Sequence, residues 1–182
     1  MLTADRADNS HQIVQLDVTE ATARLPELAE ILVDAVASGA SVSFMSPFTE
    51  TEALAYWSSL LPKIAAQQII LLVALLNDRA VGTVQLHLAT PPNQPHRAEV
   101  AKLLVHQTAR QRGIAKALLL QLETLAKQQD RTLLTLDTLA GTVAERLYHS
   151  LGYCRVGVIP GYACLPTGEL KDTVVFFKRI EP

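Results

Sequence analysis

Apolar residues recur along this chain with two different periods, and the period predicts the type of element. Residues 11–18 alternate apolar and polar positions, which is typical of a half-buried strand. Residues 20–38 instead carry apolar positions at helical spacing, with Pro26 in the first turns, where proline is tolerated. The first part of the chain therefore predicts a strand followed by one helix.

A second helix is predicted after a turn-rich connection. Thr49 or Thr51 could cap its start, because a threonine hydroxyl accepts a hydrogen bond from the first turn. The same pattern predicts that this helix reaches Leu61 and ends before Pro62, since proline lacks the N–H that continues a helix.

The rest of the chain alternates strands and helices. Residues 69–76 and 81–89 predict a hairpin that turns at Asn77 and Asp78. The other predicted elements, in chain order, are a strand at 97–105, a helix at 111–129, a strand at 132–137, a helix at 142–151, and strands at 153–159 and 173–179 joined by a loop at 160–172. This order predicts an α/β (α+β) fold with a mixed, mostly antiparallel central sheet of about seven strands, flanked by about four helices. Residues 11–182 are expected to form this single domain, and the polar residues 1–10 a disordered leader.

Composition and charge exclude several classes of partner. The formal net charge of −2 gives no overall basic field for nucleic acid, and the basic segment of the chain is poor in aromatic residues. The longest strongly apolar run, residues 69–76, is shorter than the roughly 18 residues that a membrane span requires. Residues 1–10 contain no apolar stretch that could serve as a secretory signal, so a cytoplasmic protein is expected.

The cysteines and histidines predict neither a disulfide framework nor a metal site. Cys154 and Cys164 are the only cysteines, and no C-x-x-C motif occurs. Free thiols in a reducing compartment are the simpler interpretation. His87 and His96 lack the spacing of metal ligands, so no metal is expected.

The segment ARQRGIAKALL, residues 109–119, places positive charge and a glycine at the start of a predicted helix. Unpaired N–H groups and the positive end of the helix dipole meet there, and such a position binds phosphate groups. Gly113 would let the backbone approach a pyrophosphate without a Cβ in the way. The chain has neither the G-K-(S/T) of a P-loop nor the G-x-G-x-x-G of a dinucleotide fold. The alternative is that the basic residues merely form a solvated helix start.

Residues 110–115, RQRGIA, resemble the coenzyme A signature (Q/R)-x-x-G-x-(G/A) of the Gcn5-related N-acetyltransferases (GNAT). The strand LLTLDT and the helix GTVAERLYHSLGY resemble the later motif of that family, in which A-x-x-x-Y leads to G-(F/Y). The resemblance covers about residues 11–180 in element order. It implies a sheet splayed between strands 4 and 5, and direct transfer of an acetyl group from acetyl-CoA to an amine. Gly141 is a departure, because many members carry an asparagine there that touches the pantetheine arm.

Four segments are further similar to the tabtoxin-resistance acetyltransferases within this family, which act on a small amino-acid-like toxin: GASVSFM, AEVAKLLV, LDTLAGTVAERLY and RVGVIPGY. The acceptor implied is a primary amine of a small molecule, with an amino-acid-like toxin or antibiotic as one candidate. Two alternatives remain open, namely a protein or peptide N-acetyltransferase with an open groove and a non-catalytic sensor that binds CoA. A monomer and a homodimer are both compatible with the sequence.

Three residues are candidates for the chemistry. Glu99 and Asp137 are acids on predicted neighbouring strands, where carboxylates are otherwise unexpected. The resemblance implies that they take a proton from the incoming ammonium, directly or through water. Tyr148 matches the tyrosine that protonates or hydrogen-bonds the CoA sulfur. The alternative is that the acids cap turns or pair with nearby arginines and that Tyr148 belongs to the core.

The resemblance also implies binding residues for both substrates. Backbone N–H groups of residues 102–105 would stabilise the thioester oxygen as it gains negative charge. The residues assigned to coenzyme binding are Leu103, Leu104, Val105, Arg110, Gln111, Arg112, Gly113, Ile114, Ala115, Lys116 and Tyr148. The loops 39–48 and 160–172 would cover the acceptor, and the residues assigned to it are Phe44, Met45, Tyr162 and Asp172. Phe44 and Met45 could instead simply pack between helices.

Overall fold

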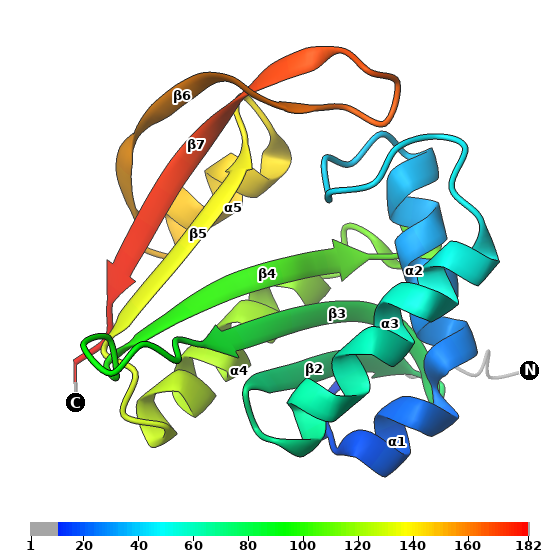
Figure 1. The fold of residues 1–182 in the computed structure, drawn as a ribbon, viewed down its shortest axis with the longest axis horizontal. Helices are drawn as coiled ribbons and strands as arrows, with labels where there is room; N and C mark the ends of the chain where they lie inside the picture. Colours follow the sequence, from blue (N-terminus) through cyan, green and yellow to red (C-terminus); the bar gives the residue numbers. More distant parts are fainter. Residues whose placement is uncertain (1–10, 182) are drawn as a thin grey trace, which may run out of the picture.

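The computed structural model describes residues 11–181, which form one sheet with helices on both of its faces (Figure 1). In chain order the elements are β1 (Gln12–Leu16), α1 (Val18–Ala23), α2 (Leu25–Ala37), α3 (Glu50–Ala65), β2 (Ile69–Leu76), β3 (Arg79–Leu88), β4 (Arg97–Val105), a 3₁₀ turn (Gln107–Ala109), α4 (Ile114–Gln128), β5 (Leu133–Leu139), α5 (Val143–Ser150), β6 (Cys154–Cys164) and β7 (Leu170–Arg179). The leader expected at 1–10 lies outside the described residues.

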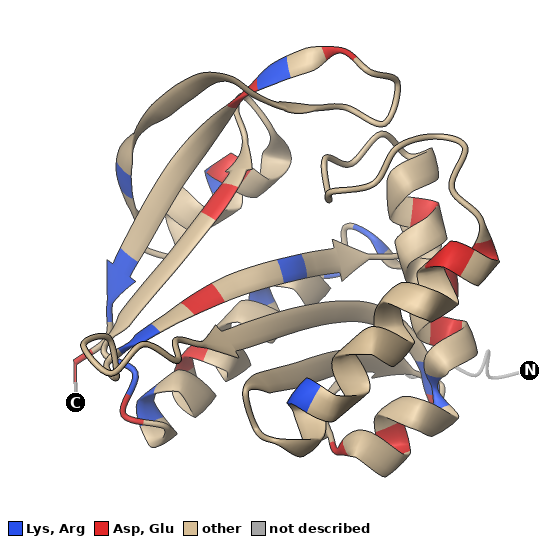
Figure 2. Cartoon of the chain, viewed as in Figure 1, with Lys and Arg blue, Asp and Glu red and all other residues tan. Residues whose placement is uncertain are grey.

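The seven strands run in the order β1-β2-β3-β4-β5-β7-β6, and only the β4–β5 pair is parallel. Two hydrophobic cores hold the layers together. One packs α1, α2 and α3 on one face, and the other packs α4 and α5 on the opposite face. In the view of Figure 2, Lys and Arg are spread over several elements and do not gather on one. The predicted fold class is confirmed.

The sheet opens between β4 and β5. Only residues 97–99 of β4 pair with residues 133–135 of β5, and beyond Glu99 the two strands diverge (Figure 1). Beyond this point the facing edges of β4 and β5 no longer pair with each other, while β4 stays paired with β3 and β5 with β7. The predicted splay between the fourth and fifth strands is present, and every candidate site residue must be placed relative to this opening.

The helix predicted at 20–38 is two helices. Asp17 and Glu20 form a capping box that starts α1, and α1 gives way to α2 at Arg24. Pro26 lies in the first turn of α2, where it has no N–H to donate and its ring would clash with the preceding turn of a continuous helix. The prediction that Pro26 lies in the first turns of a helix is confirmed. The prediction of one continuous helix at 20–38 was wrong, because Pro26 lies at the start of a second helix.

The sequence predicted the start of helix α3 better than its end. Thr49, one of the two predicted caps, caps its start together with Glu52. The predicted end before Pro62 was wrong, because α3 continues to Ala65 and Ile64 is buried in the core. Pro62 and Ser58, the residue four positions earlier, are exposed, so water can bind the carbonyl that the proline leaves without a helix partner.

The loop predicted at 160–172 is mostly strand. Strand β6 runs to Cys164 and β7 begins at Leu170, so the connection contains only residues 165–169. The β6–β7 register shifts between Ile159 and Ala163, and this bulge takes up the Pro-Gly pair that suggested a loop. Proline is tolerated because β6 is an edge strand.

Candidate active site

At residue 102 a bulge in strand β4 changes which of its side chains point to which face of the sheet. Before that residue, Ala98 and Val100 pack into the core under α4, so Glu99 lies on the opposite face. Lys102 has a φ of 50°, and the β3–β4 register shifts beside it. Beyond this bulge Leu104 packs into the core under α2 and α3. The bulge thus turns Lys102 to the same face as Glu99.

Asp137 reaches this face from the other side of the opening. Leu134 and Leu136 of β5 are buried in the core under α4, so Asp137, one residue further along, points to the opposite face. Both Glu99 and Asp137 are exposed to solvent. The structure therefore brings the two predicted acids to one side of the sheet, on the two strands that diverge.

Lys102 is a functional candidate that the sequence pattern did not single out. Its Nζ lies 5.8 Å from the ring centre of Phe44 and 5.7 Å from that of Tyr56, within cation–π range. Burial lowers the pKa of Lys102, and the carboxylates of Asp137 and Glu99 partly offset this by raising it. Strict alternation would have put Lys102 under α4, so only the bulge reveals its position.

A polar row lies beside Lys102 on the same face of the sheet. Gln85 Nε2 donates to the Tyr56 hydroxyl over 3.2 Å, and His87 Nε2 lies 2.7 Å from Gln85 Oε1. Burial, together with the positive charges of Lys102 and Lys63, lowers the pKa of His87 to about 4. His87 is therefore neutral near pH 7 and adds no charge to the site.

A cavity of about 340 Å³ opens beside Asp137. It is lined by Ser41, Ser43, Phe44, Met45, Asp137, Thr138, Leu139, Tyr162, Ala163, Cys164 and Thr173. Three of the four residues predicted to bind the acceptor therefore lie together with one predicted catalytic acid. Phe44 also stacks on Phe48 and Tyr56, with ring centres 4.5 and 5.2 Å apart, so the packing alternative holds for part of its surface.

Two hydrogen bonds hold the segment before α3 over this cavity. Ser46 N–H donates to the Pro166 carbonyl over 2.9 Å, and the Ser41 hydroxyl donates to the Cys164 carbonyl over 3.4 Å. Residues 41–46 therefore meet the β6–β7 connection above the opening in the sheet.

Asp172 is the predicted acceptor residue that does not line the cavity. Its carboxylate accepts a hydrogen bond from Gly161 N–H over 2.9 Å. Gly161 has a φ of 57° in the bulge of β6, so this bond stabilises the turn of the strand that carries Tyr162. Asp172 therefore supports the segment next to Tyr162 and does not itself line the cavity. Its assignment to acceptor binding stays a prediction.

Tyr148 lies on α5, where its ring is buried between Tyr153 and Phe176. Burial raises the pKa of Tyr148, and the nearby carboxylate of Asp137 raises it further. The phenol therefore keeps its proton throughout the neutral range. Core packing accounts for the ring, and donation of a hydrogen bond by the hydroxyl to the coenzyme sulfur stays a prediction.

The turn before α4 has the backbone geometry of an anion site. Gln111 has a φ of 64° and Gly113 a φ of 77°, and no side chain caps α4. Successive N–H groups in such left-handed turns converge on a concavity that favours anions, as does the first turn of α4. A Cβ at Gly113 would meet no protein atom within 4 Å, so the space in front of it is open. These residues fit the phosphates of a coenzyme.

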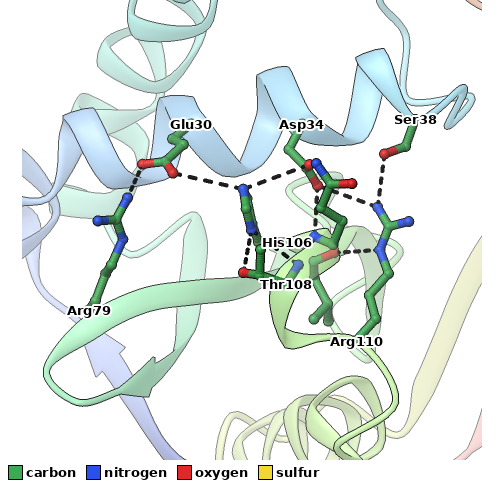
Figure 3. A network of polar contacts seen from close by, with 9 residues as sticks. Glu30, Asp34, Ser38, Arg79, His106, Thr108 and Arg110 are labelled. Atoms are coloured by element: carbon green, nitrogen blue, oxygen red, sulfur yellow. Dashed lines mark hydrogen bonds and ion pairs between the residues drawn. The ribbon is translucent and has the colours of Figure 1, made fainter.

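The guanidinium of Arg110 lies against α2 (Figure 3). Its Nη2 lies 3.4 Å from Asp34 Oδ2 and 3.3 Å from the Ser38 hydroxyl, and its Nε donates to the Val105 carbonyl over 3.0 Å. The structure therefore gives Arg110 a role in holding the 106–113 loop on the body of the protein. Phosphate binding by Arg110 itself stays a prediction.

Asp34 is the centre of this network and was missed by the sequence analysis. Its carboxylate is buried, and Oδ2 accepts a hydrogen bond from Gln107 N–H over 3.0 Å. His106 Nε2 lies 3.7 Å from Asp34 and 3.8 Å from Glu30 (Figure 3). An acid among the buried positions of an apolar helix was the signal that could have found Asp34, because such a charge requires partners.

The described residues lack two further kinds of site. Within residues 11–181, no group of three or more His, Cys, Asp or Glu side chains is arranged to hold a metal ion. None of the helices in that range combines the length and the apolar character needed to cross a membrane.

Solved structures of low sequence identity share this fold. A ribosomal-protein-alanine N-acetyltransferase from Brucella melitensis is 23% identical, with a TM-score of 0.78, over 92% of this chain and 99% of that one. The protein yncA from Salmonella typhimurium, solved with its cofactor acetyl-CoA, is 18% identical, with a TM-score of 0.76, over 95% of each chain. A protein provisionally assigned as a phosphinothricin N-acetyltransferase is 17% identical, with a TM-score of 0.78, over 95% of this chain and 100% of that one. At these identities the likeness establishes the fold.

A family model assigns the chain more directly. Residues 35–153 match the model described as the Acetyltransferase (GNAT) family, and this range contains Glu99, Asp137, Tyr148 and the 106–113 loop. The finer resemblance to tabtoxin-resistance enzymes is not tested by this match and stays a prediction. Since the match spans more than half of the chain and the fold agrees with it, the chain belongs to the Acetyltransferase (GNAT) family, whose enzymes use acetyl-CoA.

Proposed function

We propose that this protein transfers the acetyl group of acetyl-CoA to a primary amine of a small molecule. The observation that carries the proposal is the cavity of about 340 Å³, which Asp137 lines and residues 41–46 cover. Its volume lies at the lower end of the range of small-molecule sites. An amino-acid-like toxin or antibiotic remains one candidate acceptor, and the cell interior remains the expected location.

The proposed coenzyme site combines the 106–113 loop with the diverging part of β4. The N–H groups at Gln111 and Gly113 and in the first turn of α4 would bind the pyrophosphate. Backbone N–H groups of residues 102–105, released where β4 leaves β5, would bind the thioester and its carbonyl oxygen. The loop is held in place by Asp34, so the site is organised before the coenzyme arrives.

The acids would act on the acceptor nitrogen. An alkylammonium must lose a proton before it can attack, and Glu99 or Asp137 takes that proton, directly or through one water. The nitrogen then attacks the thioester carbon, a C–N bond forms, and the C–S bond breaks. A second proton leaves the nitrogen toward solvent through the same carboxylates. The products are an amide and the coenzyme thiolate, which takes up a proton from water.

Tyr148 would stabilise the departing sulfur. A coenzyme thiol has an ordinary pKa near 8.5 as a free thiol, whereas burial and Asp137 raise the pKa of Tyr148 above its usual value. The tyrosine is therefore a weaker acid than the thiol. We expect it to donate a hydrogen bond to the thiolate and to keep its proton, in preference to complete proton transfer.

The test combines coenzyme binding with turnover. Acetyl-CoA is titrated into the purified protein, and thiol release is then measured with amino acids, polyamines, amino-acid-like antibiotics and peptides. Turnover of small amines, reduced at least tenfold in Glu99→Gln or Asp137→Asn with unchanged coenzyme affinity, supports the proposal. Asp130→Asn, a change of an exposed acid after α4, is the matched control.

Two results would reject the proposal. Turnover restricted to peptide amines would identify a protein acetyltransferase, and coenzyme binding with no turnover of any acceptor would identify a sensor. The molecular mass of the protein in solution, measured on the same samples, separates the monomer from the homodimer.

A further inference from the structure

The Lys102 side chain is held at the acceptor side of the site without a partner of opposite charge in contact. Among residues 11–181, it has cation–π contacts to Phe44 and Tyr56 but forms no hydrogen bond or ion pair. An ammonium has three N–H groups to donate, and the ammonium of Lys102, a half-buried residue, loses part of its hydration. Aromatic rings compensate only a fraction of that loss. The position therefore favours an anion in contact with Nζ.

Phe44 connects this ammonium with the cavity. Its ring lies 5.8 Å from Lys102 Nζ, and the same residue lines the cavity together with Asp137. The two carboxylates that act on Lys102, those of Asp137 and Glu99, lie on the same face of the sheet. Of these three charged residues only Asp137 lines the cavity, and Lys102 is connected with it through its contact with Phe44.

We infer that Lys102 binds a carboxylate of the acceptor and makes the enzyme selective for small amines that also carry a carboxylate. The inference rests on the proposed function and narrows it to one class of acceptor. The ammonium of such a molecule faces Glu99 and Asp137, while its carboxylate completes the hydrogen bonds of Lys102. A singly charged amine would satisfy the acids and leave Lys102 without an anion.

The alternative role of Lys102 is to offset the charge of Glu99 and Asp137. In that case removal of the Lys102 charge changes kcat/KM by the same factor for every amine, whether or not the amine also carries a carboxylate. The two roles therefore differ in one measurable quantity, the ratio of kcat/KM for an amino acid to that for its amide. Comparing this ratio between variants cancels the different basicity of the two amines.

The experiment measures that ratio in the wild type, Lys102→Met, Lys102→Arg and Lys63→Met. Lys63 is an exposed lysine on α3 that also acts on His87, so its loss removes a charge from the same region without touching Phe44 or Tyr56. We expect the wild type to prefer the acid. Lys102→Met should lower the ratio at least tenfold, mainly through KM, whereas Lys102→Arg keeps most of it and Lys63→Met leaves it unchanged.

Several results would overturn the inference. An unchanged ratio in Lys102→Met, with kcat/KM lowered equally for acid and amide, assigns Lys102 to offsetting the acids. A wild type that prefers the amide also overturns it, and the proposed function survives in both cases. If no small amine is acetylated, the proposed function fails and the inference fails with it. Thermal unfolding of each variant verifies that the fold is kept.

Discussion

The 106–113 loop and the acceptor cavity are built in opposite ways. The loop is one short segment whose backbone would supply the binding groups proposed for the coenzyme, and a buried acid, Asp34, holds it through two hydrogen bonds. The cavity is assembled from residues of four separate segments, around positions 41–45, 137–139, 162–164 and 173. Its walls are side chains, and its cover depends on two hydrogen bonds between distant parts of the chain.

This difference explains which half of the site a sequence motif can identify. Backbone N–H groups bind the phosphates of any coenzyme in the same way, so a short pattern with one glycine at positive φ is sufficient. Side chains from distant segments can change independently, so the cavity has no motif of its own. We therefore expect acceptor selectivity to depend on residues such as Lys102 and Tyr162, which only the fold brings near one cavity.

Tyr148 lies close enough to Asp137 for that carboxylate to raise its pKa, and its replacement should have the largest effect. Tyr148→Phe removes the hydrogen bond to the departing sulfur, so kcat should fall about 100-fold, within the range of such donors. Stopped-flow or steady-state thiol release measures this change. The acetyl-CoA affinity and the thermal midpoint should remain near the wild-type values, because the ring stays in the core.

A wild-type kcat that declines with the ordinary tyrosine pKa of about 10 would contradict the role given to the raised pKa of Tyr148. Tyr153→Phe is the matched control. Its ring packs against Tyr148, and its hydroxyl is buried beside the Glu123 carboxylate.

Asp34→Ala breaks the support of the 106–113 loop. The change leaves Arg110 and the Gln107 N–H without their shared acceptor, and hydrogen bonds to charged groups contribute about 2 kcal/mol, so the free energy of unfolding should fall by about that amount. Denaturant unfolding measures this loss, and calorimetric titration should show weaker acetyl-CoA binding. Glu30→Ala removes the exposed acid of the same network and should cost less than about 1 kcal/mol. Equal losses in both variants would refute the central role of Asp34.

Gly113→Ala tests the concavity itself. The added Cβ meets no protein atom within 4 Å but enters the open space where the phosphates would lie, and it must adopt a φ of 77°. We expect the Kd for acetyl-CoA to rise about tenfold, equivalent to about 1.4 kcal/mol. Gly168→Ala, at a φ of 93° in equally open space of the β6–β7 connection, carries similar strain and should leave this Kd unchanged. The same rise in both would mean that backbone strain alone acts.

His87→Gln has the smallest predicted effect and concerns the polar row beside Lys102. In the folded state the pKa of His87 is lowered from 6.5 to about 4, so the unfolded chain binds a proton more readily between these values. Stability is therefore present above pH 6.5 and is lost as the pH falls toward 4. The wild type should lose free energy of unfolding between pH 7 and pH 5, and His87→Gln should reduce this loss by about 1 kcal/mol, after allowance for the partial exposure of the ring.

Urea unfolding at the two pH values provides this measurement. The variant His96→Gln, an exposed histidine of the β3–β4 connection, should retain the full wild-type loss. A His87 variant with the same pH dependence as the wild type would contradict the burial of its ring.

The sequence by itself determined the type and order of most elements and the position of the coenzyme motif. Periodicity located β4 at its observed bounds, and the two threonines Thr49 and Thr51 limited the start of α3 to two positions. The motif around Gly113 and the acids Glu99 and Asp137 were recognisable because their signals lie within short segments. Local preferences and short motifs act over a few residues, so they can be interpreted without the fold.

The tertiary structure alone decided how these segments combine. A single bulge turned Lys102 to the face of Glu99, and the edge position of β6 allowed a Pro-Gly pair inside a strand. Buried contacts continued α3 beyond Pro62, and Asp34 drew the Arg110 guanidinium toward α2. Each of these outcomes depends on a partner far away in the sequence, and packing against that partner outweighs the local preference of the residues involved.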